Sequence, residues 1–140
     1  MQNLIISYEQ LRSDHMKELE LKQVLYEKET WKRLMSFMTE ENICLKNRLS
    51  DVLKDPFNNN LLEQLECFQT RFLKADKLMD LLRRELAELE ELLARRMPQD
   101  DYTMTYMRTK LMTLRNFVSN AEREFIKLKL DFNCFLSENI

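Results

Sequence analysis

The chain has 140 residues, enough for one ordinary domain, and contains no glycine and only two prolines. Because the turns and bulges of β-structure depend on these two residues, a sheet is disfavoured, and without glycine no phosphate-binding loop can form. The net charge of −2 arises from 22 basic and 24 acidic residues, a mixture typical of a solvated helical surface, and it favours neither nucleic acid nor an anionic membrane as a partner. The composition therefore predicts an all-α protein.

The amino-terminal segment, residues 1–14, is the candidate contact region. Apolar residues at the density found here are seldom left in water without a partner. We interpret the segment as an overhanging oligomerisation or docking element, although it could instead bend at Ser13 and Asp14 and pack back on its own bundle. In the first interpretation the partner-binding residues are Leu4, Ile5, Tyr8 and Leu11.

The first predicted helix spans about residues 2–54. From Trp31 onward, one stripe of residues recurs at alternating steps of four and three, which keeps one face of a helix turned toward a partner helix. Upstream of Trp31, Lys28 interrupts this register. Asn42 is polar, and we expect it to define the helix register or the oligomeric state, as buried polar residues do in coiled coils. The stripe consists of Trp31, Met35, Met38, Asn42, Leu45, Leu49 and Val52.

Pro56 marks the first corner of the chain. A residue that precedes proline is pushed out of the helical region, so we expect a break at Asp55. Asp55 would cap the next helix with Pro56 at its first position, whereas Asn60 with a glutamate three residues later forms a competing cap. Either cap starts the second helix between Pro56 and Leu61, and we expect this helix to span about residues 57–96.

Pro98 marks the second corner, and two acidic residues follow it. Proline and acidic side chains both suit the opening turn of a helix, the acids because they face the positive end of the helix dipole. The third helix should therefore span about residues 99–137. Both corners are short, and short connections make sequential helices antiparallel neighbours.

The second and third helices carry unbroken apolar stripes with the same spacing. In the second helix the stripe consists of Leu61, Leu65, Phe68, Phe72, Ala75, Met79, Leu82, Leu86, Leu89 and Leu93. In the third helix it consists of Met104, Met107, Leu111, Leu114, Val118, Ala121, Phe125, Leu128, Phe132 and Phe135. If the two helices fold back at Pro98, facing residues have position numbers with a nearly constant sum. This rule pairs Leu65 with Phe132 and Ala75 with Ala121.

Ala75 and Ala121 are the only small residues of these two stripes, and they should meet in one layer. Two alanines opposite each other would leave a void, which costs roughly 24 cal/mol per Å³. We therefore expect a large side chain of the first helix to fill this layer. The fold-back at the first corner brings Met35, Phe37 or Met38 beside it.

These patterns predict a single domain over residues 1–140, an elongated antiparallel three-helix coiled-coil bundle that resembles a spectrin repeat in shape only. The second and third helices have about 37 residues, or roughly 55 Å at about 1.5 Å per residue. The first helix is longer by about 15 residues and would project beyond the Pro98 corner by about 22 Å. The projecting part contains the candidate contact region.

The composition offers few residues for a catalytic or metal-binding site. A di-iron carboxylate bundle needs two Glu-x-x-His pairs, and His15 is the only histidine. His15 resembles the phosphoacceptor of two-component phosphotransfer domains, although the glycine that usually follows the lysine in one such family is absent; the alternative is a surface histidine without a role. We expect no catalytic site, no metal and no cofactor.

The cysteines and the apolar runs bear on localisation. Cys44, Cys67 and Cys134 are odd in number and widely spaced, which suits a reducing compartment better than a disulfide framework. The amino terminus lacks the features of a signal peptide, and no apolar run approaches the roughly 18 residues that cross a bilayer. These features predict a cytoplasmic protein without membrane insertion.

The functional expectation is a non-catalytic coiled-coil scaffold or adaptor that makes protein–protein contacts. We expect self-association, as a dimer, through the amino-terminal region. Two alternatives stay open at this stage: a histidine-phosphotransfer-type signalling module that uses His15, and an accessory subunit of a larger bacterial-type assembly. Heptad faces indicate that helices meet, but they do not identify the partner.

Overall fold

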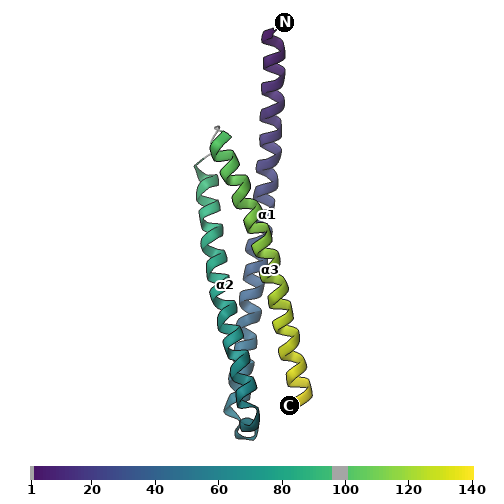
Figure 1. Cartoon of the computed structure of the whole chain (residues 1–140), viewed down its shortest axis with the longest axis vertical. Helices are drawn as coiled ribbons and strands as arrows, with labels where there is room; N and C mark the ends of the chain where they lie inside the picture. Colours follow the sequence, from purple (N-terminus) through teal and green to yellow (C-terminus); the bar gives the residue numbers. More distant parts are fainter. Residues whose placement is uncertain (1, 96–100) are drawn as a thin grey trace. The chain divides into compact units, whose positions relative to one another are not determined.

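The fold is an all-α three-helix bundle, as the sequence predicts. A computed structural model describes the backbone of residues 2–95 and 101–140, and the side chains of these residues except 2–6, 13, 14, 16, 101 and 103. No strand occurs in these two ranges. Along the chain the elements are α1 (Gln2–Lys54), the 3₁₀ helix η1 (Pro56–Leu61), α2 (Leu62–Ala94) and α3 (Asp101–Asn139), as Figure 1 shows. At 53 residues, α1 is the longest, against 33 for α2 and 39 for α3.

Two compact units divide the chain. The amino-terminal unit, Met1–Arg33, contains the first part of α1. The bundle unit, Leu34–Ile140, contains the rest of α1 together with η1, α2 and α3. Within the bundle unit α2 and α3 run in opposite directions (Figure 1), which is the predicted antiparallel arrangement.

Asp55 forms a cap at the first corner as predicted, but it caps the 3₁₀ helix η1, and α2 begins at Leu62 and not between Pro56 and Leu61. The carboxylate of Asp55 accepts a hydrogen bond of 3.0 Å from the backbone N–H of Phe57, and Pro56 occupies the first turn of η1. The carbonyl of Val52, in the last turn of α1, accepts from the Asn58 side chain at 3.0 Å and from the backbone N–H of Asp55 at 3.3 Å. Side-chain bonds of this kind compete with α-helix formation, so the chain passes through η1 before α2 begins at Leu62.

The second corner is only partly described. Helix α2 ends at Ala94, and the backbone N–H of Arg95 donates to the carbonyl of Glu91 at 3.2 Å. The predicted break at Pro98 and the caps beside it lie outside the described residues. Helix α3 begins at Asp101.

The core of the bundle unit follows the predicted stripes. Its buried members are Met35, Met38, Asn42, Leu45 and Leu49 from α1, Leu65, Phe72, Met79, Leu82, Leu86 and Leu89 from α2, and Met104, Met107, Leu111, Leu114, Val118, Ala121, Phe125, Leu128, Phe132 and Leu136 from α3. At the end of α3, Phe135 is half-buried and packs against the core as predicted, and Leu136, which the predicted stripe omits, is buried as well. A straight helix drifts by about 20° per heptad against a 3.5-residue repeat, and this drift accumulates along α3.

In the aromatic layer the Phe132 ring also contacts residues that the simple pairing rule does not assign to it. The Phe132 ring contacts Phe68, with centroids 5.2 Å apart, and Phe72, with centroids 5.0 Å apart in an edge-to-face arrangement. The rule instead pairs Phe132 with Leu65. Side chains on a helix lean toward its amino terminus, so large side chains on antiparallel helices meet partners further along both chains than their Cα positions suggest.

Ion pairs connect each pair of helices in the bundle unit. Lys129 of α3 bonds Glu41 of α1, with 2.6 Å between nitrogen and oxygen. The Lys46–Asp76 pair joins α1 to α2 at 2.6 Å, and the Arg71–Asp131 pair joins α2 to α3 at 3.0 Å. All six side chains are partly exposed, so each pair contributes at most about 1 kcal/mol. The pairs therefore add to the specificity of the helix arrangement more than to its stability.

Candidate functional site

A pocket of about 270 Å³ lies at the predicted alanine layer, and we call it the alanine pocket. Both Ala75 of α2 and Ala121 of α3 line it, which confirms that these residues share one layer. Of the three candidates from helix 1, Met38 lines the pocket, whereas Phe37 is 54% exposed. The layer is therefore only partly filled. The side chains of Ala75 and Ala121 are single methyl groups, and Met38 does not fill all the space between them.

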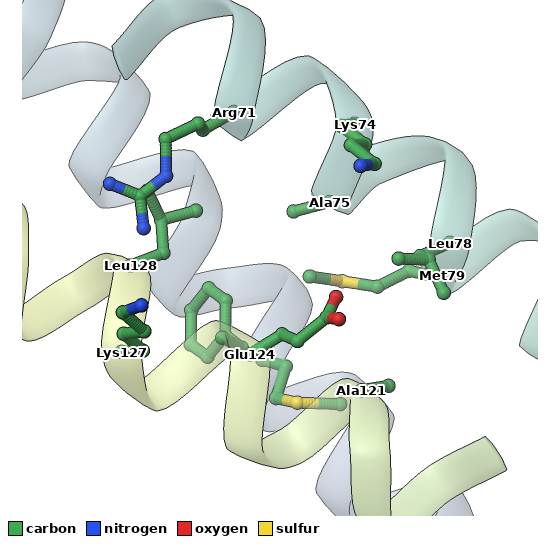
Figure 2. A pocket seen from close by; sticks show the side chains of 11 residues that line it. Arg71, Lys74, Ala75, Leu78, Met79, Ala121, Glu124, Lys127 and Leu128 are labelled. Atoms are coloured by element: carbon green, nitrogen blue, oxygen red, sulfur yellow. The ribbon is translucent and has the colours of Figure 1, made fainter. Parts of the chain in front are cut away.

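The body of the alanine pocket is apolar. Figure 2 shows Ala75 and Ala121 on the two facing helices, with the thioether of Met79 reaching into the space between them. The apolar side chains that line the pocket are Met38, Ala75, Leu78, Met79, Ala121, Phe125 and Leu128. Thioether and alkyl side chains are flexible and apolar, so they can adjust to the shape of an apolar ligand.

Four charged side chains also line the pocket: Arg71, Lys74, Lys127 and Glu124. Three are cationic and one is anionic, so the lining has an excess of positive charge. In Figure 2 the carboxylate of Glu124 reaches toward Met79, whereas Arg71 and Lys127 lie toward Leu128.

The three cations of the lining differ in what holds them. Arg71 donates to Asp131 at 3.0 Å and lies over the Phe68 ring, 5.6 Å from its centroid, so its position is constrained. Lys74 and Lys127 are exposed, and neither forms an ion pair with any part of the chain that the structure describes. The two lysines are therefore free to meet an anion.

The amino-terminal unit carries the partner-binding residues that the sequence predicts. Tyr8 and Leu11 are both 69% exposed. The side chains of Leu4 and Ile5 lie outside the described residues. Tyr8 and Leu11 both lie on α1, and their role in partner binding stays a prediction.

The exposed apolar surface continues beyond the predicted segment. Tyr26 is 67% exposed and Leu19 is 47% exposed. At about 100° per residue, Tyr8 and Tyr26 are five turns apart on the same line of the helix, Leu19 lies within about 20° of that line and Leu11 within about 60°. We call Tyr8, Leu11, Leu19 and Tyr26 the tyrosine stripe.

The sequence did not predict Leu19 and Tyr26 as contact residues, because the regular core spacing that served as the guide begins only at Trp31. Val24 is buried and lies about 160° from Tyr8, on the face opposite the stripe. The spacing of 18 residues between the two tyrosines was the available signal.

His15, the candidate phosphoacceptor, is exposed on α1. The side chains of its neighbours Asp14 and Met16 lie outside the described residues. Cys44, Cys67 and Cys134 are all free and exposed. In the part of the chain that the structure describes, no group of three or more His, Cys, Asp or Glu residues could hold a metal ion. Over the same residues, no helix is long and apolar enough to cross a membrane.

Lys110 has the most perturbed environment among the described ionisable groups. Its ammonium bonds Glu88 at 2.6 Å and Glu85 at 3.1 Å, across the α2–α3 contact. Burial by itself lowers the pKa of Lys110, but the hydrogen bonds and charges of Glu88 and Glu85 outweigh burial and raise the pKa above its ordinary value of 10.5. Lys110 therefore stays protonated at neutral pH and connects α3 to α2, and it is not suited to act as a base.

Comparison with protein-family models, curated proteins and solved structures finds no match for this chain.

Proposed function

We propose that the protein is a non-catalytic helical scaffold or adaptor that self-associates through the tyrosine stripe of its amino-terminal unit. The observation that supports this proposal is the exposure of Tyr8 and Leu11, 69% each, in line with Leu19 and Tyr26. Arg12, His15 and Lys22 lie between these four residues on the same helix face. Isolated apolar residues on a surface are ordinary, but large apolar residues that recur along one face favour packing on another helix. Tyrosine suits such a contact because its ring is apolar and its hydroxyl can form hydrogen bonds with water at the edge of the interface.

The charge of the amino-terminal unit favours a second copy as the partner. Residues 1–33 contain six basic and six acidic residues, interleaved along the helix. A neutral, mixed surface does not repel an identical one, whereas a strongly charged surface would select a partner of opposite sign. We therefore propose a homodimer, formed by helix-to-helix packing of the two stripes.

The test is the mass of the full chain in solution. Replacing Leu4, Ile5, Tyr8 and Leu11 by serine should leave helicity by circular dichroism nearly unchanged and shift the mass in light scattering from dimer to monomer. A second variant, Leu19→Ser with Tyr26→Ser, should weaken the same association. The matched control is Leu130→Ser, which removes an apolar residue that is 59% exposed on the bundle unit and should leave the mass unchanged.

Two results would contradict the proposal. A monomeric wild-type chain at concentrations above about 100 μM, where weak dimers form, would exclude self-association of useful strength. A quadruple variant that keeps the wild-type mass would exclude the amino-terminal segment as the contact.

A further inference from the structure

We propose that the alanine pocket binds a small apolar monocarboxylate, such as a medium-chain acyl or an arylalkyl carboxylate. This inference concerns the bundle unit and is independent of the proposed self-association. It is based on three properties of the pocket: its volume, its apolar body and the charges that line it.

The volume sets the size of the ligand. A cavity of about 150 Å³ lined by apolar side chains accommodates benzene, and typical small-molecule sites begin near about 300 Å³. At about 270 Å³, the alanine pocket has room for one ring with a short chain, or for a chain of medium length. A long-chain lipid would exceed it.

The apolar body defines what the pocket encloses. Met38, Met79 and Phe125 are buried residues that line it, and the thioethers of the two methionines adjust to the outline of a guest. An apolar chain placed against them is removed from water, which is favourable in proportion to the area covered. The apolar side chains of the lining offer no hydrogen-bond partner, so the polar part of a ligand would have to lie beside the charged side chains.

The charged side chains select the head group. Lys74 and Lys127 are cationic and exposed, and Arg71, which is paired with Asp131, also lines the pocket. A carboxylate at the Leu128 side would face Arg71 and Lys127, away from the end of Glu124 that reaches toward Met79 (Figure 2). Glu124 opposes additional negative charge, so a head group with one charge fits better than a phosphate dianion.

The experiment uses the full chain with methyl-¹³C methionine and octanoate as the probe. Titration should move the methyl resonances of Met38 and Met79 in a saturable way, because both side chains line the pocket. Met112, which is exposed and does not line the pocket, serves as the internal reference and should not move. Assignment follows from Met38→Leu and Met79→Leu.

Variants separate the contributions of charge and shape. The double variant Lys74→Gln, Lys127→Gln should weaken octanoate binding by about tenfold, and Glu124→Gln should strengthen it by about threefold. Lys77→Gln, which removes an exposed lysine of α2 outside the pocket, is the matched control and should leave affinity unchanged. Ala121→Leu should abolish the saturable shifts by filling the pocket, with Ala75→Leu as a second variant if the first fails to fold.

Three outcomes would overturn the proposal. The first is the absence of saturable shifts at Met38 and Met79 up to about 10 mM octanoate. The second is equal or tighter binding of octan-1-ol, which has the same chain without the charge. The third is movement of both methyl resonances with protein concentration alone, since a second copy of the chain would then occupy the pocket.

Discussion

The side-chain amide of Asn42 donates a hydrogen bond of 2.7 Å to the carboxylate of Asp76, which joins α1 to α2 inside the bundle unit. Asn42 is fully buried and also donates to the carbonyl of Phe72 at 3.3 Å. Both partners are acceptors, so the amide nitrogen must face them, and the amide oxygen is left without a hydrogen-bond partner in the described structure. The sequence predicts a register-defining role for Asn42, and this contact is the physical basis for such a role.

Removing Asp76 should therefore be costly even though the residue is only half-buried. Asp76→Ala leaves the Asn42 amide buried with one acceptor fewer and also removes the ion pair with Lys46, and we expect the free energy of unfolding to fall by about 1–3 kcal/mol. Adding Asn42→Leu should recover part of this loss, because the apolar side chain needs no acceptor. Urea denaturation of the two single variants and the double variant measures the coupling, for which about 0.5–3 kcal/mol is expected.

The control for this cycle is Asp80→Ala, one turn further along α2. Among the described residues Asp80 bonds the exposed Arg83 alone, at 2.7 Å, so its removal should change the free energy of unfolding by less than about 0.5 kcal/mol. Additive effects of Asn42→Leu and Asp76→Ala would show that the hydrogen bond between them contributes nothing measurable.

Met38 should be the most sensitive residue of the alanine layer. It is 2% exposed and faces a layer that is already under-packed. Met38→Ala enlarges the existing cavity, and we expect the free energy of unfolding to fall by about 2–5 kcal/mol. By contrast, Met112→Ala removes a methionine that is 60% exposed and should cost less than about 0.5 kcal/mol. Similar urea midpoints for the two variants would contradict the packing described for this layer.

Lys110 should contribute to stability in a manner that depends on alkaline pH. Because its pKa in the folded state lies above 10.5, the contribution is fully present below pH 10.5 and is lost as pH rises through the higher folded value. Lys110→Met keeps most of the apolar stem and removes the charge. We expect it to lower the free energy of unfolding at pH 7–9 by up to about 1 kcal/mol, because both glutamates are partly exposed and water weakens their attraction for Lys110.

The measurement is the difference between wild type and Lys110→Met across pH in urea denaturation. That difference should stay constant from neutral pH to about pH 10 and shrink above it, and added salt should also reduce it. Lys77→Met, on an exposed site of α2, should show no such dependence. A difference that grows above pH 10.5 has the opposite sign from the linkage argument and would refute it.

His15 should not act as a phosphoacceptor. The residue is exposed, and the phosphotransfer alternative depends on a slight sequence resemblance alone. Incubation of the full chain with a small-molecule phosphodonor should give no more acid-labile phosphate on the wild type than on His15→Gln. Labelling that His15→Gln abolishes would favour the signalling alternative over the scaffold proposal.

The sequence alone determined the helices, the first corner and the alanine layer. These features depend on local chemistry: the 3.5-residue spacing of apolar residues, the cap that Asp55 forms with Phe57, and the absence of glycine. Ala75 and Ala121 could be paired from position numbers because antiparallel helices with similar rise per residue keep a nearly constant sum. The same periodicity identified Asn42 as a core residue.

Only the tertiary structure decided how the side chains pack between the three helices. It placed Phe132 against Phe68 and Phe72, because the reach of a large ring along a helix is not encoded in spacing. It gave Asn42 its partner Asp76, which lies outside the predicted stripe of α2. It also showed that the alanine layer holds an unfilled pocket with lysines in its lining, because packing depends on the volumes and rotamers of side chains from three helices at once.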